Sequence, residues 1–362
     1  MAHIELKNIV KKFGSHTALD GLSLDIADGE FFVLLGETGA GKTTTLRLIA
    51  GLEKPTEGQV FIDGVDVAGW GAAERDVALV LQQYSLYPRY TVRENLAFPL
   101  KSKIRPHSKA EIDERIARAA RTLRIEHLLD RKTDRLSGGE MQRVSIGRAI
   151  VRKPRVFLMD EPLSALDAKL REALRTELKN LQKQLGATFL FVTHDQIEAM
   201  SMGDKVAVLN HGRIIQSGTP QEIYNNPRDT YVASFVGSPP MNLIDGKLVS
   251  GRAVMTPTTF ELPYAAPAGM ASNPAEGQSL VFGIRPEDVH LEAGAPVEAK
   301  VHDVENHGVE KILTLRVGDT HLRATVPAQT SVVIEDAVRF AWNPQRVVLF
   351  DKASGRSLRH SA

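Results

Sequence analysis

Cysteine is absent from this 362-residue sequence, and several other features are scarce. Without cysteine the chain has no disulfide, thiolate metal ligand or thiol nucleophile, which suits a reducing compartment. No apolar run approaches the roughly 18 residues of a membrane-spanning helix, and the opening MAHIELKN lacks a signal-peptide core, so we expect any membrane attachment to come from another protein. The formal net charge is only +1, so no global field favours nucleic acid or an anionic membrane.

What the sequence does contain is a complete phosphate-binding loop. Residues 36–43 read GETGAGKT, directly after the apolar run at residues 31–35 and before a helix-like segment that ends near residue 50. The glycines let successive N–H groups point inward, Lys42 can reach the outer phosphates, and Thr43 can ligate Mg²⁺. The pattern therefore predicts a nucleotide triphosphate site with Mg²⁺. Its expected contacts are Gly36, Gly39, Ala40, Gly41, Lys42, Thr43 and Thr44.

The chain has two sequence patterns, and the first is replaced by the second near residue 237. Over residues 1–236, short apolar strands alternate with helical stretches, which predicts an α/β domain with a mainly parallel sheet. The strands are expected at residues 31–35, 77–81, 156–159, 188–192 and 205–209. A helical subdomain is expected at about 92–150, where Ser108 and Glu111 form a capping-box pattern. Residues 237–362 consist of short β-like runs divided by Gly and Pro, which predicts an all-β domain with a flexible loop at 262–277.

A pair of carboxylates marks the expected catalytic edge of the sheet. The buried run at residues 156–159 ends in Asp160 and Glu161, where open α/β sheets bind their ligands. Asp160 is placed to hold Mg²⁺, and Glu161 is the candidate general base for an attacking water. Isolated Asp-Glu pairs are commonly solvated strand ends; the upstream phosphate loop favours the catalytic interpretation.

A third motif identifies the class of nucleotide hydrolase. Residues 136–140 read LSGGE, and a Ser before two glycines at a helix start is by itself only an N-cap with exposed N–H groups. Together with the phosphate loop and the two carboxylates, it resembles the ATP-binding cassette ATPases and their LSGGQ signature. The resemblance implies a head-to-tail dimer with two ATP molecules at its interface. Ser137, Gly138, Gly139 and Glu140 would contact the nucleotide of the partner in trans.

The same resemblance implies roles for single residues elsewhere. Phe13 would stack on adenine, Gln82 would contact Mg²⁺ and the attacking water, and His194 would contact the γ-phosphate. Asp167 would lie at the dimer interface. The plainer interpretations are a strand-end hydrophobe for Phe13, a solvated amide for Gln82 and a structural imidazole for His194.

Two residues depart from the family pattern. Glu140 stands where the family usually has Gln, and Glu37 stands where Pro or another residue is common. Both add negative charge near a polyanionic ligand, although Glu140 also suits the positive start of its own helix. The charge leaves two assemblies open, a homodimer and a pair with a paralogous ATPase.

Longer segments resemble the ATPase subunits of importers for sugars, polyols and glycerol phosphate. They lie at residues 82–88, 91–96, 235–242, 283–288 and 350–355. The resemblance implies a P-loop nucleotide hydrolase domain with a helical subdomain, followed by a regulatory all-β domain of the oligonucleotide-fold type. The implied partners are two integral membrane permease subunits, reached through a groove near residues 84–88, and indirectly an extracytoplasmic solute-binding protein. The implied location is the cytoplasmic face of the inner membrane.

Other functions are less well matched by the sequence. A cassette ATPase of DNA repair or translation is expected to carry a long coiled-coil insert or tandem cassettes, and neither pattern is present. Residues 238–362 hold 12 Lys and Arg against 14 Asp and Glu, with few aromatics to stack on bases, so we expect no nucleic-acid partner. A regulator that only binds nucleotide is disfavoured by the complete catalytic set.

Overall fold

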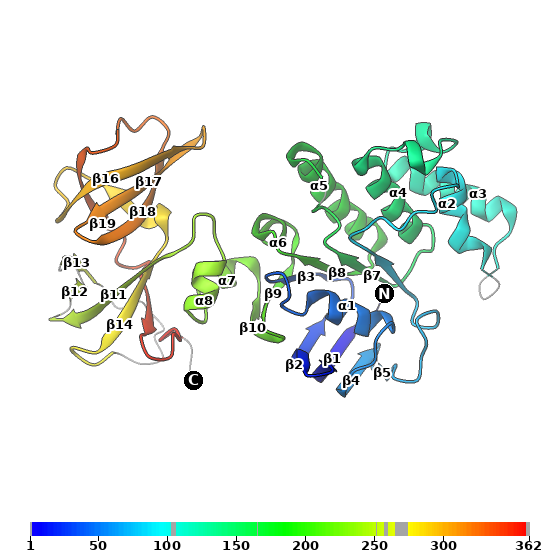
Figure 1. Ribbon diagram of the computed structural model, residues 1–362, viewed down its shortest axis with the longest axis horizontal. Coiled ribbons are helices and arrows are strands. Elements are labelled where there is room, and N and C mark those ends of the chain that lie inside the picture. Colours follow the sequence, from blue (N-terminus) through cyan, green and yellow to red (C-terminus); the bar gives the residue numbers. More distant parts are fainter. Residues whose placement is uncertain are drawn as a thin grey trace. The chain divides into compact units, whose positions relative to one another are not determined.

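The computed structural model describes residues 2–102, 106–164, 166–250, 252–256, 260–264 and 274–359, which divide into two compact units. The first unit is Met1–Pro220 and the second is Gln221–Ala362 (Figure 1). The division falls after the first residue of helix α7 (Pro220–Asn225) and before α8 (Thr230–Phe235), whereas the composition changes near residue 237. Most of the loop expected at 262–277 lies outside the described residues.

A six-stranded sheet in the order β10-β9-β3-β8-β7-β6 forms the centre of the first unit. Strands β6, β7, β8, β3 and β9 run parallel, and β10 pairs antiparallel with β9. The expected parallel strands are all present, and β3, β7 and β8 are buried along their whole length, which explains their continuous apolar sequences. The bounds are β3 Phe31–Leu35, β6 Val77–Val80, β7 Val156–Asp160, β8 Thr188–Thr193, β9 Lys205–Asn210 and β10 Arg213–Gly218.

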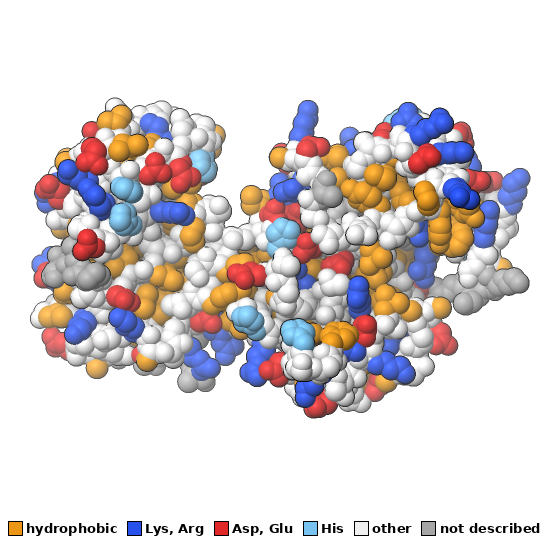
Figure 2. Space-filling model, in the orientation of Figure 1, with side chains coloured by type: hydrophobic (Ala, Val, Ile, Leu, Met, Phe, Trp, Pro, Cys, Tyr) orange, Lys and Arg blue, Asp and Glu red, His pale blue; other side chains and the backbone are white. Residues whose placement is uncertain are grey.

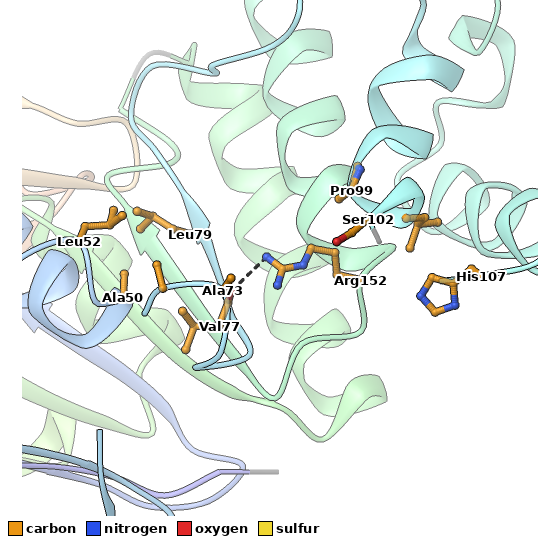
Figure 3. Close-up of a pocket in the computed structure, with 11 residues that line it drawn as sticks. Ala50, Leu52, Ala73, Val77, Leu79, Pro99, Ser102, His107 and Arg152 are labelled. Atoms are coloured by element: carbon orange, nitrogen blue, oxygen red, sulfur yellow. Dashed lines mark hydrogen bonds between the residues drawn. The ribbon is translucent and has the colours of Figure 1, made fainter. Parts of the chain in front are cut away.

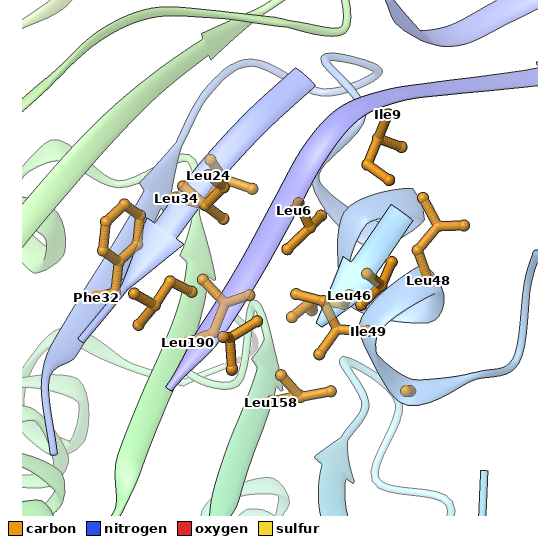
Figure 4. Close-up of a cluster of buried hydrophobic side chains, with 14 of the residues drawn as sticks. Leu6, Ile9, Leu24, Phe32, Leu34, Leu46, Leu48, Ile49, Leu158 and Leu190 are labelled. Atoms are coloured by element: carbon orange, nitrogen blue, oxygen red, sulfur yellow. The ribbon is translucent and has the colours of Figure 1, made fainter. Parts of the chain in front are cut away.

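A second, antiparallel sheet in the order β2-β1-β4-β5 was not expected from the sequence. Its strands are β1 Ile4–Phe13, β2 His16–Ile26, β4 Glu57–Ile62 and β5 Val65–Asp66. Helix α1 (Lys42–Ala50) packs between the two sheets, while α5 (Ala168–Leu185) and α6 (Gln196–Met202) cover the other face of the parallel sheet (Figure 1). Figure 4 shows Leu46 and Ile49 of α1 beside Leu6 of β1 and Leu158 of β7, in one buried apolar cluster. The phosphate loop is thereby fixed to a rigid core.

Helices make up the expected subdomain at about 92–150. Its helices are α2 Val92–Ala97, α3 Lys109–Thr122 and α4 Gly138–Ile150, with short 3₁₀ turns η1 Phe98–Lys101, η2 Glu126–Leu128 and η3 Thr133–Arg135. Ser108 accepts from the Glu111 N–H, as its capping pattern predicts, while the Glu111 carboxylate binds Arg115 (2.7 Å). A full capping box forms instead at α2, between Thr91 and Glu94. None of the described helices is both long and apolar enough to span a membrane.

The second unit contains two five-stranded sheets around one apolar core. Arg285, directly after β14, is buried, and its guanidinium donates to the Val236 carbonyl at the end of α8 and to the Tyr224 carbonyl in α7 (2.7 Å). These bonds explain why α7 and α8 group with the β-domain. On the face drawn in Figure 2, cationic and anionic side chains are interspersed over each unit. One sheet has strands β11 Asn242–Val249, β12 Arg252–Met255, β13 Glu261–Pro263, β14 Ser279–Ile284 and β20 Val348–Asp351, and the other has β15 Val289–Leu291, β16 Val297–Asn306, β17 Glu310–Val317, β18 Thr320–Pro327 and β19 Ala337–Trp342; η4 (Pro286–Asp288) links them.

Candidate nucleotide site

The phosphate loop connects β3 to α1, and its glycines have little room for side chains. At Gly41 the backbone is left-handed (φ 109°), and a Cβ would lie 2.8 Å from the Ala18 carbonyl oxygen. At Gly36 a Cβ would lie 2.5 Å from the Leu209 carbonyl oxygen. The Lys42 ammonium, nearly buried, donates to the carbonyl oxygens of Gly36 and Glu37, both at 2.9 Å. The loop is thus held in a closed curl by its own lysine.

A hydroxyl and a carboxylate meet beside the loop. Thr43 Oγ1 donates to Asp160 Oδ1 (3.1 Å), which brings the start of α1 to the end of β7. Burial raises the pKa of Asp160, and the Thr43 hydrogen bond opposes that rise. Hydroxyl and carboxylate oxygens are the ligands that Mg²⁺ takes in phosphate sites. This pair therefore fits the magnesium ion that the sequence implies.

Glu161 is at the centre of a group of polar side chains from four segments. Its Oε1 lies 3.2 Å from Lys42 Nζ, and its Oε2 lies 3.0 Å from His194 Nδ1 and 3.5 Å from Gln82 Nε2. Its backbone is left-handed (φ 45°), an unfavourable conformation for a residue with a Cβ and one often found at functional sites. The structure thus brings Lys42, Gln82, Glu161 and His194 together at one site. The sequence had indicated each of them through a separate motif.

A cavity of about 370 Å³ opens beside these groups. Its walls include Phe13, Gly39, Gly41, Thr44 and Gln82, all named from the sequence, together with His16, Ala18 and Thr38, which were missed. Phe13 and His16 are register partners across the β1–β2 turn, so the hairpin sequence FGSH was the signal that could have found His16. Phe13 is 43% exposed and carries Lys11 Nζ 4.6 Å above its ring centre. A partly exposed aromatic ring in the wall of a cavity suits stacking on a flat base.

The signature residues lie apart from this cavity. Ser137 caps α4 by accepting from the Glu140 N–H (3.3 Å), and Glu140 Oε2 in turn accepts from the Ser137 N–H (2.7 Å). This backbone hydrogen bond lowers the pKa of Glu140, and Arg131 Nη1 lies 3.7 Å from the carboxylate. Asp167 caps α5 through the Leu170 N–H (3.0 Å). None of Ser137, Gly138, Gly139, Glu140 and Asp167 lines the cavity of this chain.

The fold and the site define a P-loop nucleotide hydrolase of the ATP-binding cassette class. Family models match accordingly: "ABC transporter" at residues 19–164, "MalK OB fold domain" at 237–289 and "TOBE domain" at 282–350. The expected fold class, including the oligonucleotide-fold domain, is thereby confirmed.

Curated relatives match almost the whole chain. The trehalose/maltose import ATP-binding protein MalK of Thermococcus litoralis is 44% identical over 99% of this chain and 100% of its own length. The sn-glycerol-3-phosphate import ATP-binding protein UgpC of Rhizobium meliloti is 47% identical, and the sulfoquinovosyl glycerol transport protein SmoE of Agrobacterium fabrum is 44% identical, each over 99% of this chain and 100% of the relative. The chain belongs to the ATP-binding subunits of ATP-binding cassette importers. The importer interpretation is confirmed over DNA repair or translation.

Solved structures resemble the cassette part of the chain. A dimeric ATP-binding cassette in a post-hydrolysis state with ADP and phosphate has a TM-score of 0.55 at 34% identity, covering 60% of this chain and 98% of that one. The protein cbiO1 of Clostridium perfringens, part of the transporter complex cbiONQ, has a TM-score of 0.57 at 29% identity, covering 61% of this chain and 89% of that one.

Proposed function

We propose that this chain hydrolyses Mg²⁺-bound ATP to power uptake of a carbohydrate, polyol or glycerol-type solute. The observation that carries the catalytic part is the convergence of Lys42, Glu161 and His194 beside the Thr43–Asp160 pair. The solute class rests on the names of the relatives, which import sugars and glycerol phosphates. An ATPase subunit does not itself need to contact the solute.

Each side chain has a distinct role in this proposal. Thr43, Asp160 and Gln82 would hold the magnesium ion, which would offset the negative charge of the phosphates. Lys42 exchanges its 3.2 Å contact with Glu161 for the outer phosphates. Glu161 then accepts a proton from the water that attacks the γ-phosphorus, as ADP leaves. His194, already 3.0 Å from Glu161, donates to the γ-phosphate.

The trans site is proposed to come from a second subunit. Ser137, Gly138 and Gly139 present the start of α4, where N–H groups and the helix dipole favour an anion. Their position outside the cavity of their own chain supports a role toward a nucleotide held by another copy or by a paralogous ATPase. Glu140 and Asp167 would lie at the same interface. ATP binding would close the pair, and hydrolysis would reopen it.

A groove on the first unit is proposed to receive a membrane permease subunit at the cytoplasmic face of the membrane, with a solute-binding protein acting indirectly. The groove has a volume of about 440 Å³. Figure 3 shows Leu52 and Leu79 on one side and His107 on the other, with Arg152 between them donating to the Val77 carbonyl (3.1 Å). A neighbouring hollow shares Leu79 and Arg152 and includes Tyr84 and Ser85, within the segment 84–88 expected from the sequence. Helix α1 starts at the phosphate loop and ends at this groove, so it links the two sites.

The amount of this protein that is recovered with permease-containing membranes tests the importer part of the proposal. Leu52 is 56% exposed in the groove, and a charge there should prevent docking of an apolar permease segment. We expect Leu52→Glu to lower recovery with membranes containing the cognate permease by about tenfold, the effect of about 1.4 kcal/mol, while nucleotide binding stays unchanged. Val65→Glu is the matched control, because Val65 is also exposed (47%) and lies outside the groove. Equal recovery of the two variants would contradict this docking site.

A further inference from the structure

Thr193, the last residue of β8, is a junction between the phosphate loop and the segment that carries His194. Its backbone carbonyl accepts from the Gly36 N–H (3.3 Å). Its hydroxyl accepts from the Asp195 N–H (2.9 Å) and donates to Glu198 Oε2 (2.5 Å). Thr193 is buried, so these bonds are shielded from water. Thr193 therefore binds both the first glycine of the phosphate loop and the turn that carries His194.

Glu198 is an acidic residue at a buried position. It lies on α6 and is only 2% exposed. Within the described part of the chain, its carboxylate has a hydrogen bond to Thr193 and no ion pair; the charges of Arg171 and Arg175 act from further away. Burial raises the pKa of Glu198. A leucine would pack at such a position without the cost of burying a carboxyl group, so the acid requires another explanation.

His194 itself has little packing to hold its ring. Its side chain is 53% exposed, and its Nδ1 contacts Glu161 Oε2 at 3.0 Å. The two residues that flank it are locked instead. Thr193 is bound by Glu198, and Asp195 caps α6 by accepting from the N–H groups of Ile197 (2.8 Å) and Glu198 (3.1 Å). The direction of the imidazole is therefore set by the turn between β8 and α6.

We propose that Glu198, acting through the Thr193 hydroxyl, is a positioning residue that aims His194 at Glu161 and the transferred phosphate. The inference rests on the proposed role of His194. Glu198 does not line the cavity, so its loss removes no nucleotide contact, and any change in the rate must come through the residues it holds. Misplacing a catalytic side chain by about 1 Å lowers the rate by about 100-fold, so a hydrogen bond away from the site has a measurable effect.

The test compares threonines at the two ends of the same strand. Thr188, at the start of β8, is buried as Thr193 is, and its hydroxyl likewise donates once, to the Ala2 carbonyl (2.7 Å), and accepts once, from the Gly29 N–H (3.0 Å). Thr193→Val should lower kcat by about tenfold or more while the KM for ATP stays within about twofold. Thr188→Val should lose comparable thermal stability and keep its kcat. Thr193→Ser and Glu198→Gln retain a hydrogen bond between these side chains and should recover most of the rate.

A double-mutant cycle separates this inference from the proposed function. If Glu198 acts through His194, Glu198→Leu should lower kcat by about tenfold in the wild-type background and by less than about twofold beside His194→Ala. Equal losses in both backgrounds would overturn the inference, as would a wild-type kcat in Thr193→Val or an equal loss in Thr188→Val. A wild-type rate in His194→Ala would instead remove His194 from the mechanism. If Glu198→Leu does not fold, Thr193→Val replaces it in the cycle.

Discussion

Replacing Glu161 by Gln should change ATP binding and ATP hydrolysis in opposite directions. In the resting site the Glu161 carboxylate lies 3.2 Å from Lys42 Nζ, and the two side chains are only 14% and 5% exposed. At an effective dielectric constant of about 20, the attraction between the two charges is about 5 kcal/mol. The cost of removing both charges from water offsets most of this attraction, so the net stabilisation by the contact is about 1 kcal/mol. Since phosphate must displace Glu161 from Lys42, losing the charge should tighten ATP binding about fivefold. Turnover should fall by about 10² to 10⁴, because Gln cannot accept a proton.

The assay measures both quantities on the same protein. ATP affinity is titrated in Glu161→Gln and in wild type, turnover is followed by phosphate release, and native mass reports the closed dimer that ATP should trap. Glu172→Gln is the control, because Glu172 is an exposed acid on α5 and lies outside the cavity. Turnover within about threefold of wild type would exclude Glu161 as the base. Weaker ATP binding would refute the exchange of partners at Lys42, even if turnover were lost.

Two further predictions concern acids with perturbed pKa values. Glu140→Gln keeps an oxygen that can accept from the Ser137 N–H but removes the negative charge. ATP-dependent dimerisation should therefore tighten at low salt, with a smaller gain at high salt. Equal or weaker dimerisation at both salt concentrations would mean that Glu140 only caps α4. Because burial raises the folded-state pKa of Asp160, its charge destabilises the fold at neutral pH and this cost disappears as the pH falls through that pKa. Without Mg²⁺, Asp160→Asn should therefore melt higher than wild type at pH 7, with a smaller difference near pH 4, while Mg²⁺-dependent hydrolysis is lost. A lower melting temperature at pH 7 would contradict that sign.

The nucleotide-binding elements could be predicted from the sequence because their backbone conformation and burial depend on neighbouring residues. The loop needs glycine at Gly36 and Gly41, where a Cβ would collide with backbone, so the spacing itself encodes the curl. The central strands are buried on both faces and therefore appear as unbroken apolar runs that end in the residues of the site, such as Asp160. The order of these motifs along the chain was sufficient to indicate the family.

The antiparallel sheet of β1, β2, β4 and β5 was decided by tertiary structure. Strand β1 alternates irregularly between buried and exposed positions, with register shifts against β2, so its sequence has no clear period of two. Its partner β4 is far along the chain, beyond the phosphate loop and α1. Pairing between strands so far apart in the chain cannot be deduced from either strand alone.

Side-chain partners within the site were also decided by the fold. The sequence contained Lys42, Glu161 and His194 in separate motifs, but only the alignment of β3, β7 and β8 brings both Lys42 and His194 to within 3.2 Å of the Glu161 carboxylate. The same alignment joins Thr193 to Gly36. A sequence specifies burial and local backbone conformation through short-range constraints. Which polar groups meet depends on strand register and helix packing, and those are set by the whole chain at once.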